Sequence, residues 1–256
     1  IYTFVNDDPD LKIINYFLTG KTLTKDDGGA AITVSNSKVS LISEDGQILD
    51  EYFTREDGFY KFRVYAQENY NIRVEKPTYF SARKVFSTVG RSIRRDTLTQ
   101  FQTDVVFELD VELDQIVIEK TIVINNIYYD LDKAEIRKDA AFILDSLVLM
   151  LEDNPEIYIE LGSHTDDRNT DAYNLDLSQR RAKSAVDYLI GRGIQSKRVL
   201  AKGYGETKLM IENAQTEAEH QINRRTEFKV LKYDLQEIEV EESVDEYERF
   251  FENDNK

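Results

Sequence analysis

Hydrophobic and polar residues alternate in short runs through the first part of the chain, and turn residues separate the runs. Such a pattern is typical of antiparallel β-strands that expose one face to solvent. Gly46 and Gly58 fall in two of the turns, at positions that favour a positive φ. The pattern predicts a β-sandwich of about seven strands, and its clearest strands are expected at residues 39–43, 52–54, 59–64, 70–74 and 105–113.

The spacing of hydrophobic residues changes after residue 130. Between Ile136 and Leu151 they recur at steps of three and four, which predicts a helix with one buried face. Residues 157–161 then alternate again, which predicts a strand that exposes one face and ends at Gly162.

A second helix and two further strands are expected in the last third of the chain. Ser178 has the side chain of a helix N-cap, so the helix is predicted to begin there and to end at residues 191–193. Strands follow at 199–204 and 226–231, with a polar segment between them. The order β-α-β-α-β-(α)-β predicts helices packed on one face of a mixed sheet.

These patterns predict an α+β protein of two domains, in which a seven-stranded-type β-sandwich precedes a βαβαβ(α)β domain. The densely acidic end of the chain is expected to be a tail or a poorly anchored helix. The predicted divisions are an upstream linker or propeller remnant at 1–16, the sandwich at 17–113, a linker at 114–126, the second domain at 127–233 and the acidic tail at 234–256.

Composition and charge narrow the functional classes. The 256 residues carry a formal net charge of −16, and an acidic surface does not suit nucleic-acid phosphates or anionic lipids. Cysteine is absent, which excludes disulfides and thiolate metal sites. No apolar run approaches the roughly 20 residues of a membrane-spanning helix, and the first residues lack the order of a signal peptide. We therefore expect a mature or excised segment with no transmembrane helix and no cofactor.

One polar stretch between the predicted strand and the second helix carries the most distinctive residues. It belongs to an ordered set of motifs: Ile-Tyr-Tyr-Asp-Leu-Asp-Lys at 127–133, His-Thr-Asp at 164–166, Tyr-Asn-x-x-Leu-Ser-x-x-Arg-Ala at 173–182, Gly-Tyr-Gly-Glu at 203–206 and Asn-Arg-Arg at 223–225. This set resembles the OmpA-like peptidoglycan-binding family. The resemblance is specific because many spaced positions agree in order.

The resemblance implies recognition of the peptide stem of peptidoglycan, where diaminopimelate presents an ammonium and a carboxylate on one carbon. Asp166 matches the family position that accepts from the ammonium. Arg181 matches the position that clasps the carboxylate, through a planar guanidinium fork that lysine lacks. The resemblance further implies a groove lined by Tyr129, Asp130, Leu131, Thr165, Asn174 and Leu177, with Arg225 as a contact to a further stem carboxylate.

Two positions depart from the family pattern. Asn169 stands where the family usually has glycine, and asparagine tolerates the left-handed conformation that a glycine would adopt. Residues 207–210, Thr-Lys-Leu-Met, replace a turn that usually contains proline. Both departures concern loop shape more than the central pair of charges.

The N-terminal segment carries motifs of its own. A Thr-x-x-Asp-Gly-x-Tyr-x-Phe hairpin covers 54–62, and a Tyr-x-Ile-x-Val-x-Lys strand covers 70–76. Their order resembles the carboxypeptidase-regulatory-like, transthyretin-like sandwich. A sandwich beside a wall-binding domain also resembles the PorE-like components that anchor the type IX secretion machinery, which would place the chain in the periplasm at the outer membrane.

The site residues have other interpretations. Asp166 and Arg181 also suit a structural ion pair that locks the loop to the helix. His164 suits a zinc ligand or a general base, but only His220 could join it, so a loop-bracing side chain is the simpler interpretation.

Two charged groups have simpler explanations outside ligand binding. Arg224 and Arg225 suit exposed charges near the last strand. The acidic runs before Gly28 and Gly58 suggest calcium, but no twelve-residue ligand loop is present and turn formation explains them.

Two rival functions remain. A wall-cleaving enzyme would need paired carboxylates, a metal cluster or an activated nucleophile, and none is recognisable in the sequence. An interaction module of the envelope would use the sandwich as its working surface. We expect a non-enzymatic peptidoglycan anchor for an outer-membrane assembly, with the envelope scaffold as the alternative.

Overall fold

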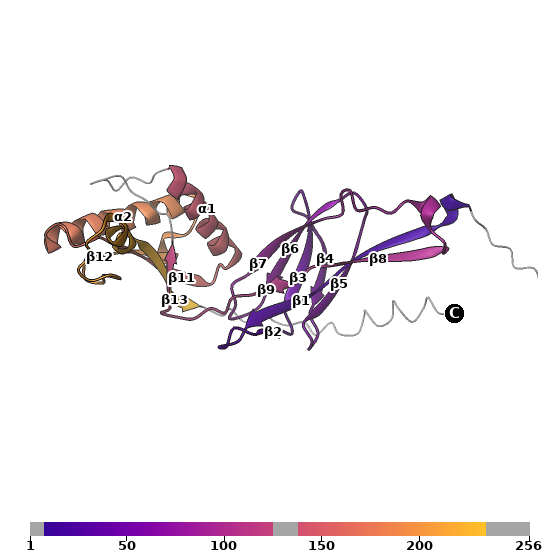
Figure 1. Cartoon of the computed structure of the whole chain (residues 1–256), viewed down its shortest axis with the longest axis horizontal. Helices are drawn as coiled ribbons and strands as arrows, with labels where there is room; N and C mark the ends of the chain where they lie inside the picture. Colours follow the sequence, from indigo (N-terminus) through magenta and orange to yellow (C-terminus); the bar gives the residue numbers. More distant parts are fainter. Residues whose placement is uncertain (1–7, 125–137, 234–256) are drawn as a thin grey trace, which may run out of the picture.

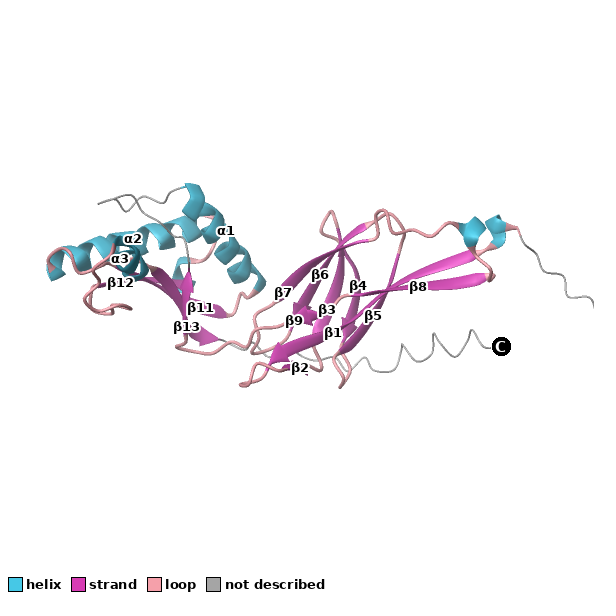
Figure 2. Ribbon diagram, in the orientation of Figure 1, coloured by secondary structure: helices cyan, strands magenta, loops and turns pink. Residues whose placement is uncertain are grey.

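The computed structural model describes residues 8–124 and 138–233, which form two domains arranged end to end (Figure 1). Strands build the first domain, and strands together with helices build the second (Figure 2). The predicted α+β organisation is thereby confirmed, with the sandwich first and the mixed domain second. None of the described helices is long and apolar enough to cross a membrane.

Two β-sheets pack against each other in the N-terminal domain. The first contains β1 (Ile13–Lys25), β2 (Ala31–Thr33), β5 (Phe59–Val64), β8 (Gln102–Glu108) and β9 (Val111–Glu112), and the second contains β3 (Lys38–Ser43), β4 (Ile48–Phe53), β6 (Asn69–Glu75) and β7 (Ala82–Ser87). In the first sheet, β1 runs antiparallel to β2 and β5 and parallel to β8 and β9. The second sheet is antiparallel, in the order β4-β3-β6-β7.

The alternating pattern produces the core of this sandwich. Leu18, Phe62 and Ile72 come from facing sheets and are at most 1% exposed. The turns that follow β3 and β4 use Gly46 and Gly58 with φ of 87° and 73°, as the sequence predicted. Both values lie in the left-handed region that glycine adopts without steric cost.

The prediction of a single strand at residues 105–113 is wrong. The structure breaks it into β8, which ends at Glu108, and β9, which begins at Val111. Between them the side chain of Asp110 accepts the N–H of Lys21 at 2.7 Å, in place of a backbone carbonyl. This substitution interrupts the regular pairing with β1.

The C-terminal domain is a four-stranded mixed sheet with helices. Its elements are β10 (Thr121–Ile124), α1 (Lys138–Asp153), β11 (Ile157–His164), α2 (Asp171–Gly191), β12 (Val199–Gly205), α3 (Glu217–Asn223) and β13 (Thr226–Tyr233), and 3₁₀ turns cover Pro9–Leu11, Arg95–Thr97 and Ser196–Arg198. The sheet order is β10-β13-β11-β12, with β11 and β12 parallel. Helices α1 and α2 cover one face (Figure 2), where Leu144, Leu161 and Leu189 form part of the core.

Both segments expected as linkers contribute to the folded domains. β1 begins at Ile13, inside the range 1–16. In the range 114–126, Ile116 joins the core of the C-terminal domain and β10 pairs with β13. Each domain therefore begins earlier in the sequence than predicted.

The predicted start of the second helix is also wrong. α2 begins at Asp171, and the hydroxyl of Thr170 caps it by accepting the N–H of Tyr173. Ser178 lies in the middle of the helix, fully buried, where its hydroxyl accepts the N–H of Gly205 at 2.8 Å. The buried positions in the first turns of α2 include the polar Asn174 and Ser178, so the hydrophobic spacing marks only the later part of the helix.

β11 likewise differs from its prediction, because it runs past Gly162 to His164 and is buried on both faces. Ile159 and Leu161 point into the helix-covered core, so Glu160 between them points to the opposite face. Glu160 is nevertheless only 5% exposed. On that face the side chain of Tyr204 lies against it, and the Tyr204 hydroxyl donates a hydrogen bond to its carboxylate. Alternating polarity alone did not reveal this covering side chain.

The two domains contact each other where the loop before β7 meets the end of α1. The backbone N–H of Ser81 donates to Asn154 at 2.9 Å, and its hydroxyl donates to the carbonyl of Asp153 at 3.1 Å. Arg83 forms a two-pronged ion pair with Asp153, and Phe80 packs against the C-terminal core. The end of α1 is thus held by residues of the sandwich.

Candidate functional site

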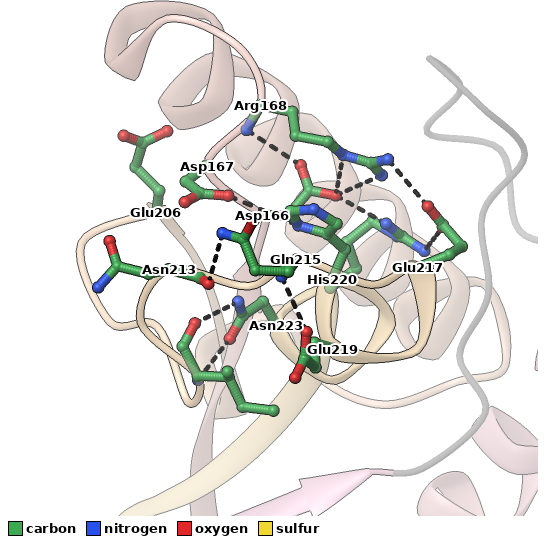
Figure 3. A network of polar contacts seen from close by, with 12 residues as sticks. Asp166, Asp167, Arg168, Glu206, Asn213, Gln215, Glu217, Glu219, His220 and Asn223 are labelled. Atoms are coloured by element: carbon green, nitrogen blue, oxygen red, sulfur yellow. Dashed lines mark hydrogen bonds and ion pairs between the residues drawn. The ribbon is translucent and has the colours of Figure 1, made fainter.

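The loop that follows β11 carries the first part of the candidate site (Figure 3). It is fixed to its neighbours by main-chain contacts. The N–H of Thr165 donates to the carbonyl of Gly205 in β12 at 2.9 Å. The carbonyl of Asp166 accepts from the side-chain amide of Asn174 in α2 at 3.0 Å. The loop therefore joins β12 to the start of α2 and sets the position of the Asp166 carboxylate.

One face of α2 carries the second part of the site. Asn174, Leu177 and Arg181 are spaced by three and four residues, so they share a helix face. They are only 1%, 5% and 6% exposed. The described structure thus places five predicted residues on the loop and on this face, namely Thr165, Asp166, Asn174, Leu177 and Arg181, whereas Tyr129, Asp130 and Leu131 lie outside the described residues.

The Asp166 carboxylate is one of four charged groups that form a closed ring of ion pairs (Figure 3). Its Oδ2 accepts from Nε and Nη2 of Arg168 at 3.1 and 2.7 Å and from Nη1 of Arg224 at 2.7 Å. Glu217 closes the ring, because it also pairs with both arginines, at 2.8 Å from Arg168 and 2.5 Å from Arg224. Positive and negative groups alternate around the ring, so their charges balance.

The members of this ring differ in exposure. The side chain of Asp166 is 7% exposed and that of Arg224 is 21% exposed, whereas Arg168 and Glu217 are 45% and 68% exposed. Burial by itself would raise the pKa of Asp166, but hydrogen bonds from Arg168 and Arg224 outweigh burial and hold that pKa below its ordinary value of 3.8. Asp166 is therefore an anion at neutral pH.

Asn223 organises the wall next to the ring. Its side-chain oxygen accepts the N–H groups of Met210 and Ile211 at 2.8 and 2.9 Å, and its amide donates to the carbonyl of Ile211 at 2.8 Å. The residue is fully buried. Arg224 follows Asn223 directly in the sequence. The hydrogen bonds of Asn223 therefore fix the backbone from which the Arg224 side chain reaches Asp166.

His164 and Arg225 form a separate cluster on the sheet face opposite the helices. The His164 ring stacks on Tyr204, with centroids 4.9 Å apart and planes at 3°. Its Nε2 lies 3.0 Å from Glu227, and Nε of Arg225 lies 3.3 Å from the other oxygen of that carboxylate. Burial would raise the pKa of Glu227, but the contacts with His164 and Arg225 lower it below the ordinary 4.5. This geometry agrees with a bracing role for His164.

The interpretation of Arg224 and Arg225 as exposed charges is wrong. The side chains are 21% and 9% exposed, and each meets a carboxylate. Arg225 pairs with Glu227. No sequence pattern connects Arg224 to Asp166, although the two side chains lie 2.7 Å apart.

The other missed residues are Arg168 and Glu217. Arg168 lies two residues after Asp166, a spacing at which a loop side chain returns readily to its neighbour. Glu217 and Arg224 are seven residues apart, which corresponds to one face of a short helix. These spacings were visible in the sequence, but they gain meaning only once α3 is known to face the loop.

The chemistry that the arrangement offers is that of its charged groups. A buried carboxylate on a loop and a buried guanidinium on the adjoining helix suit a ligand that carries both charges. Within residues 8–124 and 138–233, no group of three or more histidine, aspartate or glutamate residues could hold a metal ion.

Comparison with known proteins places the site in a family. The family model described as "OmpA family" matches residues 128–224. A peptidoglycan-associated lipoprotein of Pasteurella multocida is 35% identical over 101 residues, which cover 40% of this chain and 67% of that protein. An outer membrane porin F of Pseudomonas fluorescens is 35% identical over 105 residues, covering 41% of this chain and 32% of the porin.

A solved structure gives a similar match. The peptidoglycan-associated lipoprotein from Burkholderia pseudomallei is 27% identical, and the comparison covers 41% of this chain and 87% of that chain with a TM-score of 0.38. This chain spans only about a third of the length of the porin F protein, 32%. The ordered motifs, the mixed sheet with its helices and the matches over residues 128–224 together show that this chain belongs to the OmpA family.

Proposed function

We propose that this chain binds peptidoglycan non-covalently through the diaminopimelate of the stem peptide. The observation that carries the proposal is a buried carboxylate, Asp166, next to a helix face that buries a guanidinium, Arg181. Burying such groups costs free energy unless specific partners compensate the charge, and a zwitterionic ligand would supply a partner for each of them. Both residues lie within the segment matched by the OmpA family, and one relative is named a peptidoglycan-associated lipoprotein.

The proposed ligand has complementary charges. Its ammonium would donate to Asp166, which is ionised because its pKa is lowered. Its carboxylate would accept two parallel hydrogen bonds from the planar fork of Arg181. In this proposal Thr165, Asn174 and Leu177 shape the groove, Tyr129, Asp130 and Leu131 line its opposite wall, and Arg225 serves a further stem carboxylate.

The wider proposal is an anchor in the cell envelope. A chain that holds the wall at one end and a partner at the other would tether an outer-membrane-associated assembly, for which type IX secretion is the narrower candidate. The relatives named as outer membrane porin F and peptidoglycan-associated lipoprotein support a periplasmic, outer-membrane-associated position. We propose a binding role without catalysis, in which the carboxypeptidase-regulatory-like sandwich docks the partner.

A second candidate function is an envelope scaffold in which the sandwich carries the main activity. The contacts of Ser81 and Arg83 with the end of α1 favour it, because they hold the two domains in one orientation. A scaffold would depend on that orientation whether or not the wall is bound. A variant that loses wall binding but still binds the partner of the sandwich separates the two candidates. Full function of such a variant in the envelope would favour the scaffold.

Sedimentation with purified wall sacculi tests the proposed function. Asp166→Asn removes the charge and keeps the side-chain shape, and Arg181→Lys keeps the charge and removes the fork. We expect each variant to lose at least roughly tenfold in affinity, as the loss of a charge-assisted contact implies. Lys183→Ala is the matched control, because Lys183 pairs with Asp187 on the exposed side of the same helix. Wild-type pelleting of both site variants would refute the proposal.

A further inference from the structure

Two cationic side chains of the protein already contact the Asp166 carboxylate. Arg168 directs two N–H groups at Oδ2, from Nε at 3.1 Å and from Nη2 at 2.7 Å. The backbone N–H of the same residue approaches Oδ1 at 3.4 Å. A ligand ammonium that is to bind Asp166 therefore meets a cation of the protein in the place it needs.

The two arginines on Asp166 are held differently. Arg224 is largely buried, and its guanidinium also contacts Glu217 and Gln221, while its backbone N–H donates to His220. Its neighbour in sequence is the fully buried Asn223. Arg224 is consequently a fixed partner that stays on the carboxylate.

Arg168 is the member of the ring that is free to leave. It sits on the loop before α2, and its side chain is 45% exposed. Its outer partner, Glu217, is 68% exposed, so that contact is weakened by water and is easily exchanged. Water can solvate the Arg168 guanidinium as soon as it turns outward.

Departure of Arg168 would leave Asp166 suited to an ammonium. Arg224 would remain at 2.7 Å and keep the carboxylate ionised. An ammonium carries three N–H donors and can supply the two contacts that Arg168 gives up. One cation then replaces another, so the charge balance of the ring is preserved.

We propose that Arg168 is a built-in competitor of the ligand: it occupies the ammonium subsite on Asp166 in the free protein and is displaced when an ammonium-bearing stem peptide binds. This inference rests on the proposed function. Arg168 neutralises a buried carboxylate that would otherwise be left with a single partner, which stabilises the empty site. The same contact lowers the apparent affinity for the ligand, because its loss is part of the binding reaction. Arg168 thereby sets the affinity of the site, although it does not belong to the central pair of charges.

The test is calorimetric titration of the full chain and its Arg168→Ala variant with a soluble stem tripeptide that contains diaminopimelate. We expect Kd to fall roughly fivefold in the variant, the effect of removing a partly exposed ion pair that competes with the ligand. We also expect the ligand-free variant to melt at a lower temperature than the wild type. Tighter binding together with lower stability is a combination that a merely structural residue would not produce.

Controls separate the parts of this claim. Arg168→Gln keeps most of the side-chain length and should also tighten binding, so the result does not depend on one truncation. Arg180→Ala removes an equal charge from the exposed side of α2, where Arg180 pairs with Asp176, and should leave Kd unchanged. A tripeptide in which the side-chain amine of diaminopimelate is acetylated lacks the ammonium that competes with Arg168. It should bind weakly and equally to the wild type and to Arg168→Ala.

The outcomes distinguish this inference from the proposed function. If the wild type binds the tripeptide and Asp166→Asn does not, but Arg168→Ala binds equally or more weakly than the wild type, the competitor role is overturned and the proposed function stands. If neither the wild type nor Arg168→Ala binds the tripeptide, both are overturned.

Discussion

The two domains differ in what they bury. The sandwich fills its interior with apolar side chains such as Leu18 and Phe62, and the polar residues it buries are mostly threonine and serine. The C-terminal domain buries full charges, among them Glu160, Asp166 and Arg181. Hydroxyl groups are satisfied cheaply by nearby carbonyls, whereas buried charges require specific partners.

The buried charges of the C-terminal domain differ in turn in the partners that they contact. Arg198 donates to the carbonyls of Leu151, Asn154 and Ile157 and joins the end of α1 to the start of β11. The carboxylate of Asp166 instead meets side chains, namely the largely buried Arg224 and the half-exposed Arg168. The fixed backbone partners of Arg198 indicate an architectural role, whereas the exposed partner of Asp166 supports the binding role proposed for it.

The largest expected effect is on the sandwich alone. Phe62→Ala should destabilise the protein by about 4 kcal/mol, because the side chain is 1% exposed and its removal leaves a cavity. Urea denaturation measures this loss, with Tyr65→Ala as a control because Tyr65 is 66% exposed. Affinity for the stem peptide, measured where the variant is still folded, should not change. A large loss of affinity would break the separation of scaffold from site.

The next effect concerns the architectural charge. Arg198→Ala should cost about 3 kcal/mol, because three backbone carbonyls lose their buried donor. Thermal and urea unfolding measure the change. We expect stem-peptide affinity to stay within about twofold of the wild type, a difference well below the worth of one hydrogen bond. A variant as stable as the wild type would show that Arg198 is not architectural.

A smaller effect depends on pH. Glu227 has a lowered pKa, so its charged contacts contribute stability above its ordinary pKa of 4.5, and that contribution is lost as pH falls through the folded-state pKa. Glu227→Gln should therefore destabilise the protein by about 1 kcal/mol at neutral pH. The difference from wild type should shrink in acid, when urea denaturation is repeated below pH 4.5. A difference that is constant over this pH range would contradict the assigned role.

The smallest effect concerns the boundary between the domains. Arg83→Ala removes an ion pair in which Asp153 is 8% and Arg83 is 50% exposed, so the expected loss is about 0.5 kcal/mol. Hydrogen exchange should report faster opening at the end of α1, while the Phe62 core keeps its protection. Arg55→Ala, an exposed change elsewhere in the sandwich, serves as the control. Unchanged exchange at α1 would mean that the ion pair does not couple the domains.

Much of the fold follows from residue spacing, and the exceptions have physical causes. Strands at 59–64 and 70–74 were predictable because alternation marks one buried face. The start of α2 was not, because the buried positions of its first turns include the polar Asn174 and Ser178, which interrupt the hydrophobic period. The break at Asp110 depends on a side chain that replaces a backbone acceptor, which no periodicity records.

The candidate site was predictable only in part. Asp166, Asn174 and Arg181 stand in motifs that a sequence displays directly. The contact between Asp166 and Arg224 joins residues 58 positions apart, so it exists only after α3 packs beside the loop. The partners of a charged group are set by tertiary structure, and the competing role proposed for Arg168 could not be derived before those partners were known.

Calorimetric titration with two stem tripeptides, one containing diaminopimelate and one containing lysine, tests zwitterion recognition most directly. Lysine at the same position lacks the second carboxylate that Arg181 is proposed to hold. The account predicts saturable heat with the diaminopimelate peptide, roughly tenfold weaker binding of the lysine peptide, and no saturable heat in Asp166→Asn. Equal binding of the two peptides, or wild-type binding by Asp166→Asn, would contradict it.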